Sequence, residues 1–271
     1  MSIISFIIPY YNQAKYIEET LRSVIASTYQ NFEIIIVDDG SEDKNKTQLL
    51  EIIEVINYKR IRIFHQQNAG PSVARNFAIS KANGEFLVFL DGDDLIEKDT
   101  LELSLKVFNK TPDIDVVYGN NILFGEKNKI IIPKKIHPNT ILVFNPIAVC
   151  VIIKKSVFQN NQFDEYLSKL GLEDWELWMN LISKNYKFHY INHNLFKIRV
   201  LPNSRTTTEA NPNLAKIKAY IYQKHSDFLS KQFHDLYYTQ KQTLETPDYK
   251  IGNVLMKPYR WFKKIIKKII D

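Results

Sequence analysis

Hydrophobic positions in the first 120 residues follow two periodicities in turn. Short continuous apolar runs, typical of strands buried on both faces, alternate with segments whose apolar residues recur every three or four positions, as in amphipathic helices. The predicted strands are residues 3–8, 32–37, 61–64, 86–90 and 114–117, and the predicted helices are residues 16–25, 47–56, 72–82 and 101–108. Helices of this length between strands form βαβ units, so we expect an α/β fold with an open, mostly parallel central sheet flanked by helices.

The alternation becomes irregular after residue 120. Gly125 separates two short strand-like segments that predict a hairpin. The segments concerned are residues 121–124 and 129–132 for the hairpin, 149–153 for a further buried strand, 175–182 for a helix, and 188–191 and 196–200 for two late strands. Residues 213–243 are polar and favour helix.

Composition is that of an ordinary soluble globular protein, with 45% hydrophobic and 24% charged residues among 271. The single cysteine, Cys150, lies in an apolar run and is expected to be a small core residue in a reducing compartment. The sequence shows no basic, apolar leader, and no apolar run approaches the roughly 20 residues that span a bilayer. These features predict a cytoplasmic protein.

The net charge of +6 is unevenly distributed. The N-terminal half is close to balanced, whereas residues 258–271 contain one arginine and four lysines. A local basic tail differs from a basic binding face, so we expect no nucleic-acid partner.

The tail itself has the pattern of an amphipathic helix. Its apolar side chains fall on one half of a helical wheel and its lysines on the other: Trp261, Phe262, Ile265, Ile266, Ile269 and Ile270 against Lys263, Lys264, Lys267 and Lys268. This division is typical of a helix lying in a membrane interface, which predicts peripheral contact with the inner face of the cytoplasmic membrane. A helix packed on its own domain or on a second subunit remains an alternative, and the oligomeric state is open.

An acidic cluster follows the predicted strand 86–90. Asp91, Asp93 and Asp94 emerge at the strand end, the edge of an open α/β sheet at which ligands usually bind. Crowded carboxylates repel one another unless a cation lies among them, and Mg²⁺ or Mn²⁺ takes one or two carboxylates together with phosphate and water. The cluster predicts a metal–diphosphate site. The alternative is an acidic loop in which Asp94 caps the next helix.

Four further motifs accompany the acidic cluster in a fixed order. They are Pro9-Tyr-Tyr-Asn12, Asp38-Asp39-Gly-Ser41, the Asn-x-Gly-x-x-x-Ala-Arg-Asn segment at 68–76, and Glu173-Asp174-Trp-Glu176. Over roughly residues 3–200 this ordered set resembles the family 2 glycosyltransferases, which have the nucleotide-diphospho-sugar-binding GT-A fold. The resemblance implies a GT-A domain over 1–205, with a nucleotide-binding half (1–118) and an acceptor-binding half (119–205). A helical extension (206–257) and the basic amphipathic helix (258–271) would follow.

The resemblance implies a donor site for a UDP-sugar in the first half. The Asp39 carboxylate would accept the imide N–H of uracil, Pro9 and Tyr10 would wall the base pocket, and Asn12 would tie down the loop. Arg75, one turn into a helix whose first N–H groups are expected to be free, would reach the uracil or the diphosphate. The alternatives are an Asx-turn formed by Asp38 and Asp39 with Gly40, plain packing at Tyr10 and a surface ion pair at Arg75.

The resemblance also implies the reacting groups. Asp91 would belong to the ribose or metal shell, and Asp93 would coordinate Mn²⁺ or Mg²⁺. Asp174 would be the general base, although carboxylates such as Glu173 are also favoured in a first helical turn for structural reasons. Glu173 is a further acceptor or diphosphate candidate, and Trp175 would offer its face to a sugar ring.

One motif departs from the family pattern. Where the family often has Arg-x-His-x-x-Ser on a loop over the diphosphate, this chain has Arg199-Val-Leu-Pro-Asn-Ser204, with Leu201 in place of the histidine. Arg199 and Ser204 remain candidates, with Arg199 or Arg205 supplying positive charge.

The sequence therefore predicts an inverting, metal-dependent glycosyltransferase that moves a sugar from a UDP-sugar to a glycan or lipid-linked acceptor in bacterial surface polysaccharide synthesis. A sugar-phosphate nucleotidyltransferase is an alternative, but residues 9–13 lack the glycine-rich loop of that class. An inactive sugar-nucleotide-binding subunit is the other alternative, to which Leu201 gives support.

Overall fold

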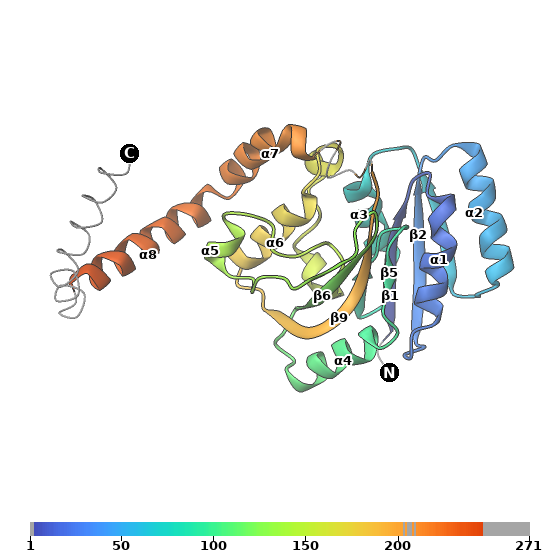
Figure 1. Cartoon of the computed structure of the whole chain (residues 1–271), viewed down its shortest axis with the longest axis horizontal. Helices are drawn as coiled ribbons and strands as arrows, with labels where there is room; N and C mark the ends of the chain where they lie inside the picture. The colour runs from blue at the N-terminus through green and yellow to red at the C-terminus, as the bar shows by residue number, and fades with distance from the viewer. Residues whose placement is uncertain (1–2, 203, 205–207, 209, 246–271) are drawn as a thin grey trace, which may run out of the picture. The chain divides into compact units, whose positions relative to one another are not determined.

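A computed structural model of the chain describes residues 3–202, 204, 208 and 210–245. The chain divides into two units, Met1–Lys224 and His225–Asp271. Within the described residues the first unit contains a nine-stranded sheet with its helices, and the second contains helix α8 (Ser226–Glu245) (Figure 1). The amphipathic helix predicted at 258–271 lies outside the described residues. In the part that is described, no helix has both the length and the hydropathy needed to cross a bilayer.

The first unit begins with alternating strands and helices, as expected. The strands are β1 (Ile4–Tyr10), β2 (Phe32–Asp39), β3 (Ile61–Gln66), β4 (Phe86–Phe89), β5 (Leu95–Ile96), β6 (Val116–Gly125), β7 (Lys129–Ile131), β8 (Ile152–Lys154) and β9 (Phe188–Val200). The helices are α1 (Ala14–Ile25), α2 (Asp43–Ile56), α3 (Pro71–Lys81), α4 (Thr100–Lys110), α5 (Pro138–Ile141), α6 (Glu173–Ser183) and α7 (Asn211–Lys224), with 3₁₀ turns η1 (Lys155–Gln159) and η2 (Tyr166–Lys169).

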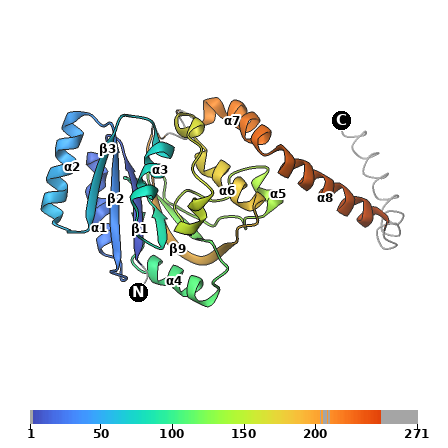
Figure 2. The same cartoon turned by 180° about the vertical axis from the view of Figure 1, so that it is seen from behind.

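The N-terminal half of the sheet is parallel and confirms the predicted βαβ units. Its strand order is β3-β2-β1-β4, and all three neighbouring pairs are parallel. Helices α1 and α2 lie on one face of these strands and α3 on the other, as Figures 1 and 2 show from opposite sides. The strand order therefore reverses between β1 and β4, and the carboxyl ends of strands beside such a reversal are where open α/β sheets bind ligands.

The second half of the sheet is mixed rather than parallel. Strand β8 is antiparallel to both β4 and β6, whereas β6 and β9 run parallel. The predicted hairpin around Gly125 is confirmed by the antiparallel pairing of β6 with β7.

Two pairs of predicted strands are single long strands in the structure. Residues 114–117 and 121–124 were expected as separate strands, as were 188–191 and 196–200, but β6 and β9 run through both gaps. The register between them shifts on either side of Asn120, which marks a β-bulge. A bulge interrupts the period-two alternation, so the polar residues around it resemble a loop in the sequence.

The core contains the single cysteine, as expected: Cys150 is buried. Trp178 on α6 is buried as well. The Trp178 ring packs edge-on against Phe188 of β9, with ring centroids 6.0 Å apart. Its indole Nε1 is buried and has no hydrogen-bond partner within the described residues.

Helix α7 is part of the first unit, although a domain end was expected near residue 205. Lys224 Nζ lies 2.9 Å from Glu176 Oε1 of α6 and also pairs with Asp164. Tyr220 Oη donates to Asp164 Oδ2 over 2.7 Å. Because Glu176 is almost fully buried, the Lys224 cation is needed to compensate its charge.

Trp178 allows a test of the core. We expect Trp178→Ala to lower the free energy of unfolding by about 3–5 kcal/mol, because a large buried side chain is lost. Trp178→Phe should cost only about 1–2 kcal/mol, since it keeps the ring contact with Phe188 and removes an unpartnered N–H. Urea denaturation measures both, and equal losses for the two variants would contradict this packing.

Candidate active site

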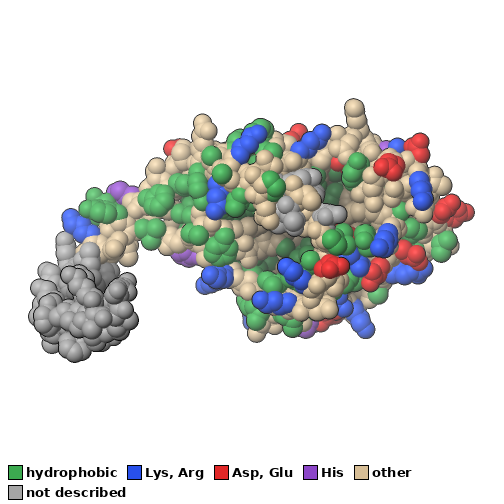
Figure 3. Space-filling view, turned by 45° about the horizontal axis from the view of Figure 1, so that its top comes forward, with side chains coloured by type: hydrophobic (Ala, Val, Ile, Leu, Met, Phe, Trp, Pro, Cys, Tyr) green, Lys and Arg blue, Asp and Glu red, His purple; other side chains and the backbone are tan. Residues whose placement is uncertain are grey.

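A cavity of about 940 Å³ opens at the carboxyl ends of β1, β2 and β4. Figure 3 shows this face hollowed, with hydrophobic side chains in and around the hollow. Ten of the residues singled out from the sequence line the cavity: Pro9, Tyr10, Asp39, Arg75, Asp91, Asp93, Glu173, Asp174, Arg199 and Ser204. Asn12 and Trp175 do not line it.

Asn12 fastens two loops beneath the cavity. Its backbone N–H donates to Ser41 Oγ, and its Oδ1 accepts from the backbone N–H of Glu42, each over 2.9 Å. The φ of Asn12 is 53°, in the left-handed region that asparagine tolerates. This residue therefore ties the loop after β1 to the loop after β2, as expected, without facing the cavity.

Asp39 orders the segment that leads into α3. Its Oδ1 accepts from Gln66 Nε2 and from the backbone N–H of Ala69, both over 2.8 Å, and its Oδ2 accepts from Gly70 N–H over 2.7 Å. A carboxylate has about four acceptor positions, so one remains for a ligand donor. Asp38 also holds the turn after β2: its Oδ1 accepts from Ser41 N–H three residues on, one residue further than in the Asx-turn considered for this motif.

The expectation of free N–H groups at the start of α3 is wrong. Gly70 N–H is bonded to Asp39, Pro71 has no N–H, and Ser72 N–H donates to Ser168 Oγ over 3.0 Å. Gly70 has a φ of 90°, and a Cβ there would lie 2.4 Å from Ser168 Oγ. The close approach of η2 to this turn therefore requires glycine.

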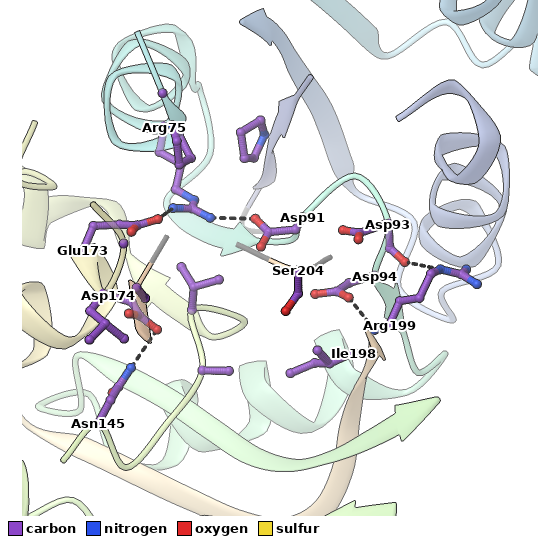
Figure 4. A pocket seen from close by; sticks show the side chains of 18 of the residues that line it. Arg75, Asp91, Asp93, Asp94, Asn145, Glu173, Asp174, Ile198, Arg199 and Ser204 are labelled. Carbon is purple, nitrogen blue, oxygen red and sulfur yellow. Dashed lines mark hydrogen bonds and ion pairs between the residues drawn. The ribbon is translucent and has the colours of Figure 1, made fainter. Parts of the chain in front are cut away.

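Arg75 is the cation at the centre of the cavity wall. Its Nη2 donates to Asp91 Oδ1 over 2.6 Å and its Nη1 to Glu173 Oε1 over 2.8 Å, as Figure 4 shows. Its guanidinium also lies over the ring of Phe163, 5.3 Å from the centroid. Only 2% of Arg75 is exposed, so the surface ion pair considered from the sequence is in fact a buried one. Burial disfavours the charged guanidinium, but the two carboxylates outweigh it and raise the pKa of Arg75.

The remaining acids of the cluster are held from the opposite side. Asp93 Oδ1 accepts from Gln13 Nε2 over 3.1 Å, and burial together with the charge of Asp91 raises the pKa of Asp93 to about 6. Asp94 is buried, and its Oδ1 accepts from the backbone N–H of Arg199 over 2.8 Å.

The expected capping role of Asp94 is wrong. Strand β5 intervenes between the cluster and α4, and the residue at the N-cap of α4 is Asp99. Asp94 instead accepts from the end of β9 and, over 3.6 Å, from the thiol of Cys150.

Asp91 and Asp93 are the two carboxylates that would hold a divalent cation. No group of three or more His, Cys, Asp and Glu side chains in the described ranges is arranged to hold a metal ion. Two carboxylates are nevertheless what Mg²⁺ or Mn²⁺ uses when a diphosphate and water supply the other ligands. Asp91 is about one-third exposed and gives one oxygen to Arg75, so the pair fits such a cation.

Asp174 lies across the cavity, in the first turn of α6. Its Oδ2 accepts from Asn145 Nδ2 and its Oδ1 from the backbone N–H of Trp175, each over 2.8 Å. Burial, and then the charge of neighbouring Glu173, raise the pKa of Asp174 to about 6, partly offset by the Asn145 hydrogen bond. Leu172, just before this turn, has a φ of 62°, which is strained for a leucine.

The expectation that Trp175 offers its face to a sugar ring is wrong. Trp175 is 1% exposed, and its Nε1 donates to the carbonyl oxygen of Ile141 over 2.7 Å. Its ring meets Tyr222 of α7 edge-on, with centroids 6.2 Å apart. Trp175 is therefore a buried packing residue that connects α6 to α5 and α7.

The segment after β9 closes one side of the cavity. Arg199 Nε donates to the carbonyl oxygen of Asp93 over 3.0 Å, and its Nη2 pairs with Glu19 over 2.5 Å. Its charge is therefore balanced by a protein carboxylate. Leu201 and Ser204 line the cavity, whereas Arg205 lies outside the described residues.

Gln13 and Asn145 are site residues that the sequence did not indicate. Gln13 binds Asp93, and Asn145 binds Asp174. Asn145 lies in a stretch without clear periodicity, between α5 and β8, so only the three-dimensional arrangement identifies it.

Comparisons with known proteins agree with this arrangement. The family model "Glycosyl transferase family 2" matches residues 5–166. An uncharacterized glycosyltransferase of Rickettsia felis is 34% identical over 93% of this chain and 43% of its own length. The Escherichia coli protein WfgD, a UDP-Glc:alpha-D-GlcNAc-diphosphoundecaprenol beta-1,3-glucosyltransferase, is 29% identical over 68% of this chain and 71% of its own length.

The fold matches a solved glycosyltransferase. The structure of S. aureus TarS in complex with UDP-GlcNAc superposes with a TM-score of 0.62 and 23% identity, covering 77% of this chain and 61% of that chain. The expected GT-A fold is thereby confirmed. This chain spans less than half of the length of the Rickettsia relative.

The Arg75 ion pairs predict a large loss of stability in one variant. Arg75→Met should lower the free energy of unfolding by about 3–5 kcal/mol at neutral pH, because Asp91 and Glu173 both lose the buried guanidinium that pairs with them. The double variant Arg75→Met with Glu173→Gln should recover part of that loss. Urea denaturation of wild type and of these variants measures the loss. An Arg75→Met protein as stable as wild type would show that the ion pairs of Arg75 with Asp91 and Glu173 do not stabilise the fold.

Proposed function

The chain belongs to glycosyl transferase family 2, and on this premise we propose that it transfers a sugar from a UDP-sugar to a hydroxyl of its acceptor with inversion at the anomeric carbon. One observation carries the proposal. A single cavity is lined by Asp39, by Arg75 with the Asp91–Asp93 pair, and by Asp174. Figure 4 shows Arg75 between Asp91 and Glu173, with Asp174 beside Glu173. The cavity thus combines a carboxylate that could bind the nucleobase, groups that could bind the diphosphate, and a candidate general base.

The donor end of the cavity has groups suited to a uridine nucleotide. The acceptor position left on Asp39 suits the imide N–H of uracil, and Pro9 and Tyr10 line the adjoining wall. Burial, and then the charge of Asp38, raise the pKa of Tyr10 to about 12, and its hydroxyl donates to the Asn45 carbonyl. The Tyr10 side chain is therefore held in place by its hydrogen bond, and its hydroxyl is uncharged at neutral pH. In TarS the bound donor is UDP-GlcNAc, and WfgD is named for UDP-Glc, which supports a UDP-sugar here.

Asp91 and Asp93 would hold Mn²⁺ or Mg²⁺ beside the diphosphate. Such a cation supplies positive charge that stabilises the departing nucleotide. Arg75 fixes the orientation of Asp91, while Gln13 and Arg199 fix the Asp93 side chain and backbone. The protein thereby fixes both carboxylates before the donor binds.

Asp174 would act as the general base. With a pKa near 6 its carboxylate is ionised at neutral pH, yet it is more basic than an exposed aspartate. It would take the proton from the acceptor hydroxyl as that oxygen attacks the anomeric carbon opposite the departing diphosphate. One base and no enzyme nucleophile give inversion, so a UDP-α-sugar would yield a β-linkage.

The acceptor is proposed to be a growing bacterial surface glycan, either free or carried on a lipid. WfgD is named for a diphosphoundecaprenol-linked acceptor, which supports a lipid carrier. The amphipathic pattern of residues 258–271 supports peripheral attachment to the membrane that such a carrier occupies.

A catalytically inactive sugar-nucleotide-binding subunit is the second candidate. The observation that favours it is Leu201 on the cavity wall, where the family often has histidine. Asp174 and Asp93 are both present in the cavity, which favours the active enzyme.

The experiment that tests this function is UDP release by the purified chain from a panel of UDP-sugars, with Mn²⁺ or with EDTA. We expect slow release from one donor, at least tenfold faster with Mn²⁺. No release from any donor, together with no rise in melting temperature on adding UDP and Mn²⁺, would refute a UDP-sugar donor.

Asp174→Asn tests the assignment of Asp174 as the general base. The amide cannot accept the proton, so we expect transfer to fall by about 10²–10⁴-fold while UDP binding stays within about twofold of wild type. Transfer assays and UDP titrations provide the two measurements. A fully active Asp174→Asn enzyme would contradict the assignment.

The pKa of Asp174 sets a pH dependence. Because the base must be ionised, kcat should be level above pH 7 and fall about tenfold per unit below pH 6. Measuring kcat with saturating donor and Mn²⁺ separates Asp174 from Asp93, which would be held by the metal under those conditions. A profile that stays flat down to pH 5 would exclude a base with this pKa.

A further inference from the structure

Among the described residues, the Asn145 side chain has one hydrogen bond, and it is with Asp174. Its Nδ2 donates to Asp174 Oδ2 over 2.8 Å, and both side chains line the cavity (Figure 4). The other amide atom, Oδ1, is buried and has no partner among the described residues. The orientation of the amide is therefore set by Asp174: turned over, it would place a carbonyl oxygen against a carboxylate oxygen.

Two asparagines that join loops in this protein are bonded at both ends of the amide. Asn76 donates to the carbonyl oxygen of Phe163 and accepts from the same residue's N–H. Asn161 donates to Val157 and accepts from Asn180 and Lys184. The Asn145 amide lacks a second bond among the described residues, and its one bond is to the carboxylate of Asp174.

The segment is fastened by other contacts. Trp175 Nε1 donates to the carbonyl oxygen of Ile141, and Tyr222 Oη donates to that of Leu142, each over 2.7 Å. These bonds join the end of α5 to α6 and α7. Asn145 follows three residues later and is thus supported on the helix that carries Asp174.

We propose that Asn145 is a positioning residue for proton transfer, holding the Asp174 carboxylate in one orientation and in its ionised form. This inference rests on the proposed function, in which Asp174 is the general base. The two carboxylate oxygens have different neighbours: Oδ1 accepts from Trp175 N–H, and Oδ2 accepts from Asn145. The Asn145 bond therefore fixes the plane of the carboxyl group relative to the acceptor hydroxyl.

Two charged groups act on Asp174 besides this amide. Glu173, its neighbour on α6, disfavours the ionised form, and Arg75 of α3 favours it. Lys169 of η2 is exposed and lines the same cavity. Arg75 already pairs with Glu173 and Asp91, so the donors bonded to Asp174 that offset the effect of burial are Asn145 and the Trp175 N–H.

The test is the pH dependence of kcat in Asn145→Ala and in Asn145→Leu, which is close to asparagine in size but has no hydrogen-bond donor, measured with the full chain at saturating sugar donor and Mn²⁺. Loss of the Asn145 N–H should move the acidic limb of the kcat–pH profile upward by about one pH unit. On the plateau, kcat should fall about tenfold while KM for the donor changes by less than about twofold. Asn121→Ala is the matched control, because Asn121 also lines the cavity with a buried, unpartnered Oδ1 and has no hydrogen bond to Asp174.

The outcomes separate this inference from the proposed function. An upward shift of the limb in both Asn145 variants, with the limb of Asn121→Ala at its wild-type position, supports the positioning role. An unshifted limb in folded Asn145→Leu, whose melting temperature still rises with UDP, overturns it. In that case an inactive Asp174→Asn protein would leave the proposed function intact, whereas an active one would refute the base itself.

Discussion

The site depends on one buried guanidinium. Arg75 joins Asp91, at the end of β4, to Glu173, at the start of α6, two residues that are far apart in sequence and belong to different halves of the fold. Burying a charge is unfavourable unless it is paired, so the buried guanidinium depends on the two carboxylates that pair with it. The ion pairs thereby hold the acidic cluster beside the helix that carries Asp174, and they fix the two halves of the cavity relative to each other.

Several neighbouring contacts follow the same principle. The cavity wall carries more carboxylates than cations, and the protein compensates them with fixed donors: three for Asp39, Gln13 for Asp93, and Asn145 for Asp174. Arg199 supports the cluster from the other side and is itself balanced by Glu19. A polyanionic donor with its cation would thus meet groups that are already oriented, which reduces the reorganisation needed for transfer.

The sequence was informative where local patterns decide the structure. Continuous apolar runs identified β1, β2 and β4, and because parallel strands end at one edge, the motifs that follow them were expected to meet. It was less informative where distant contacts decide. The bulge at Asn120 divided β6 and β9 into apparent pairs of strands, Asp94 is bound by β9 instead of capping α4, and the helical position of Trp175 did not reveal that α5 and α7 cover it. Asn145 has no local signal, because its role depends on a residue 29 positions away.

The most direct test of a donor site in this cavity is a calorimetric titration of UDP into the purified chain, with Mn²⁺ and with EDTA. We expect saturable binding of one UDP per chain, tighter with Mn²⁺, and weakened in Asp39→Asn, which loses the carboxylate proposed to face uracil. Absence of binding under both conditions would contradict the donor site. Equal binding by wild type and Asp39→Asn would contradict the placement of the base at Asp39.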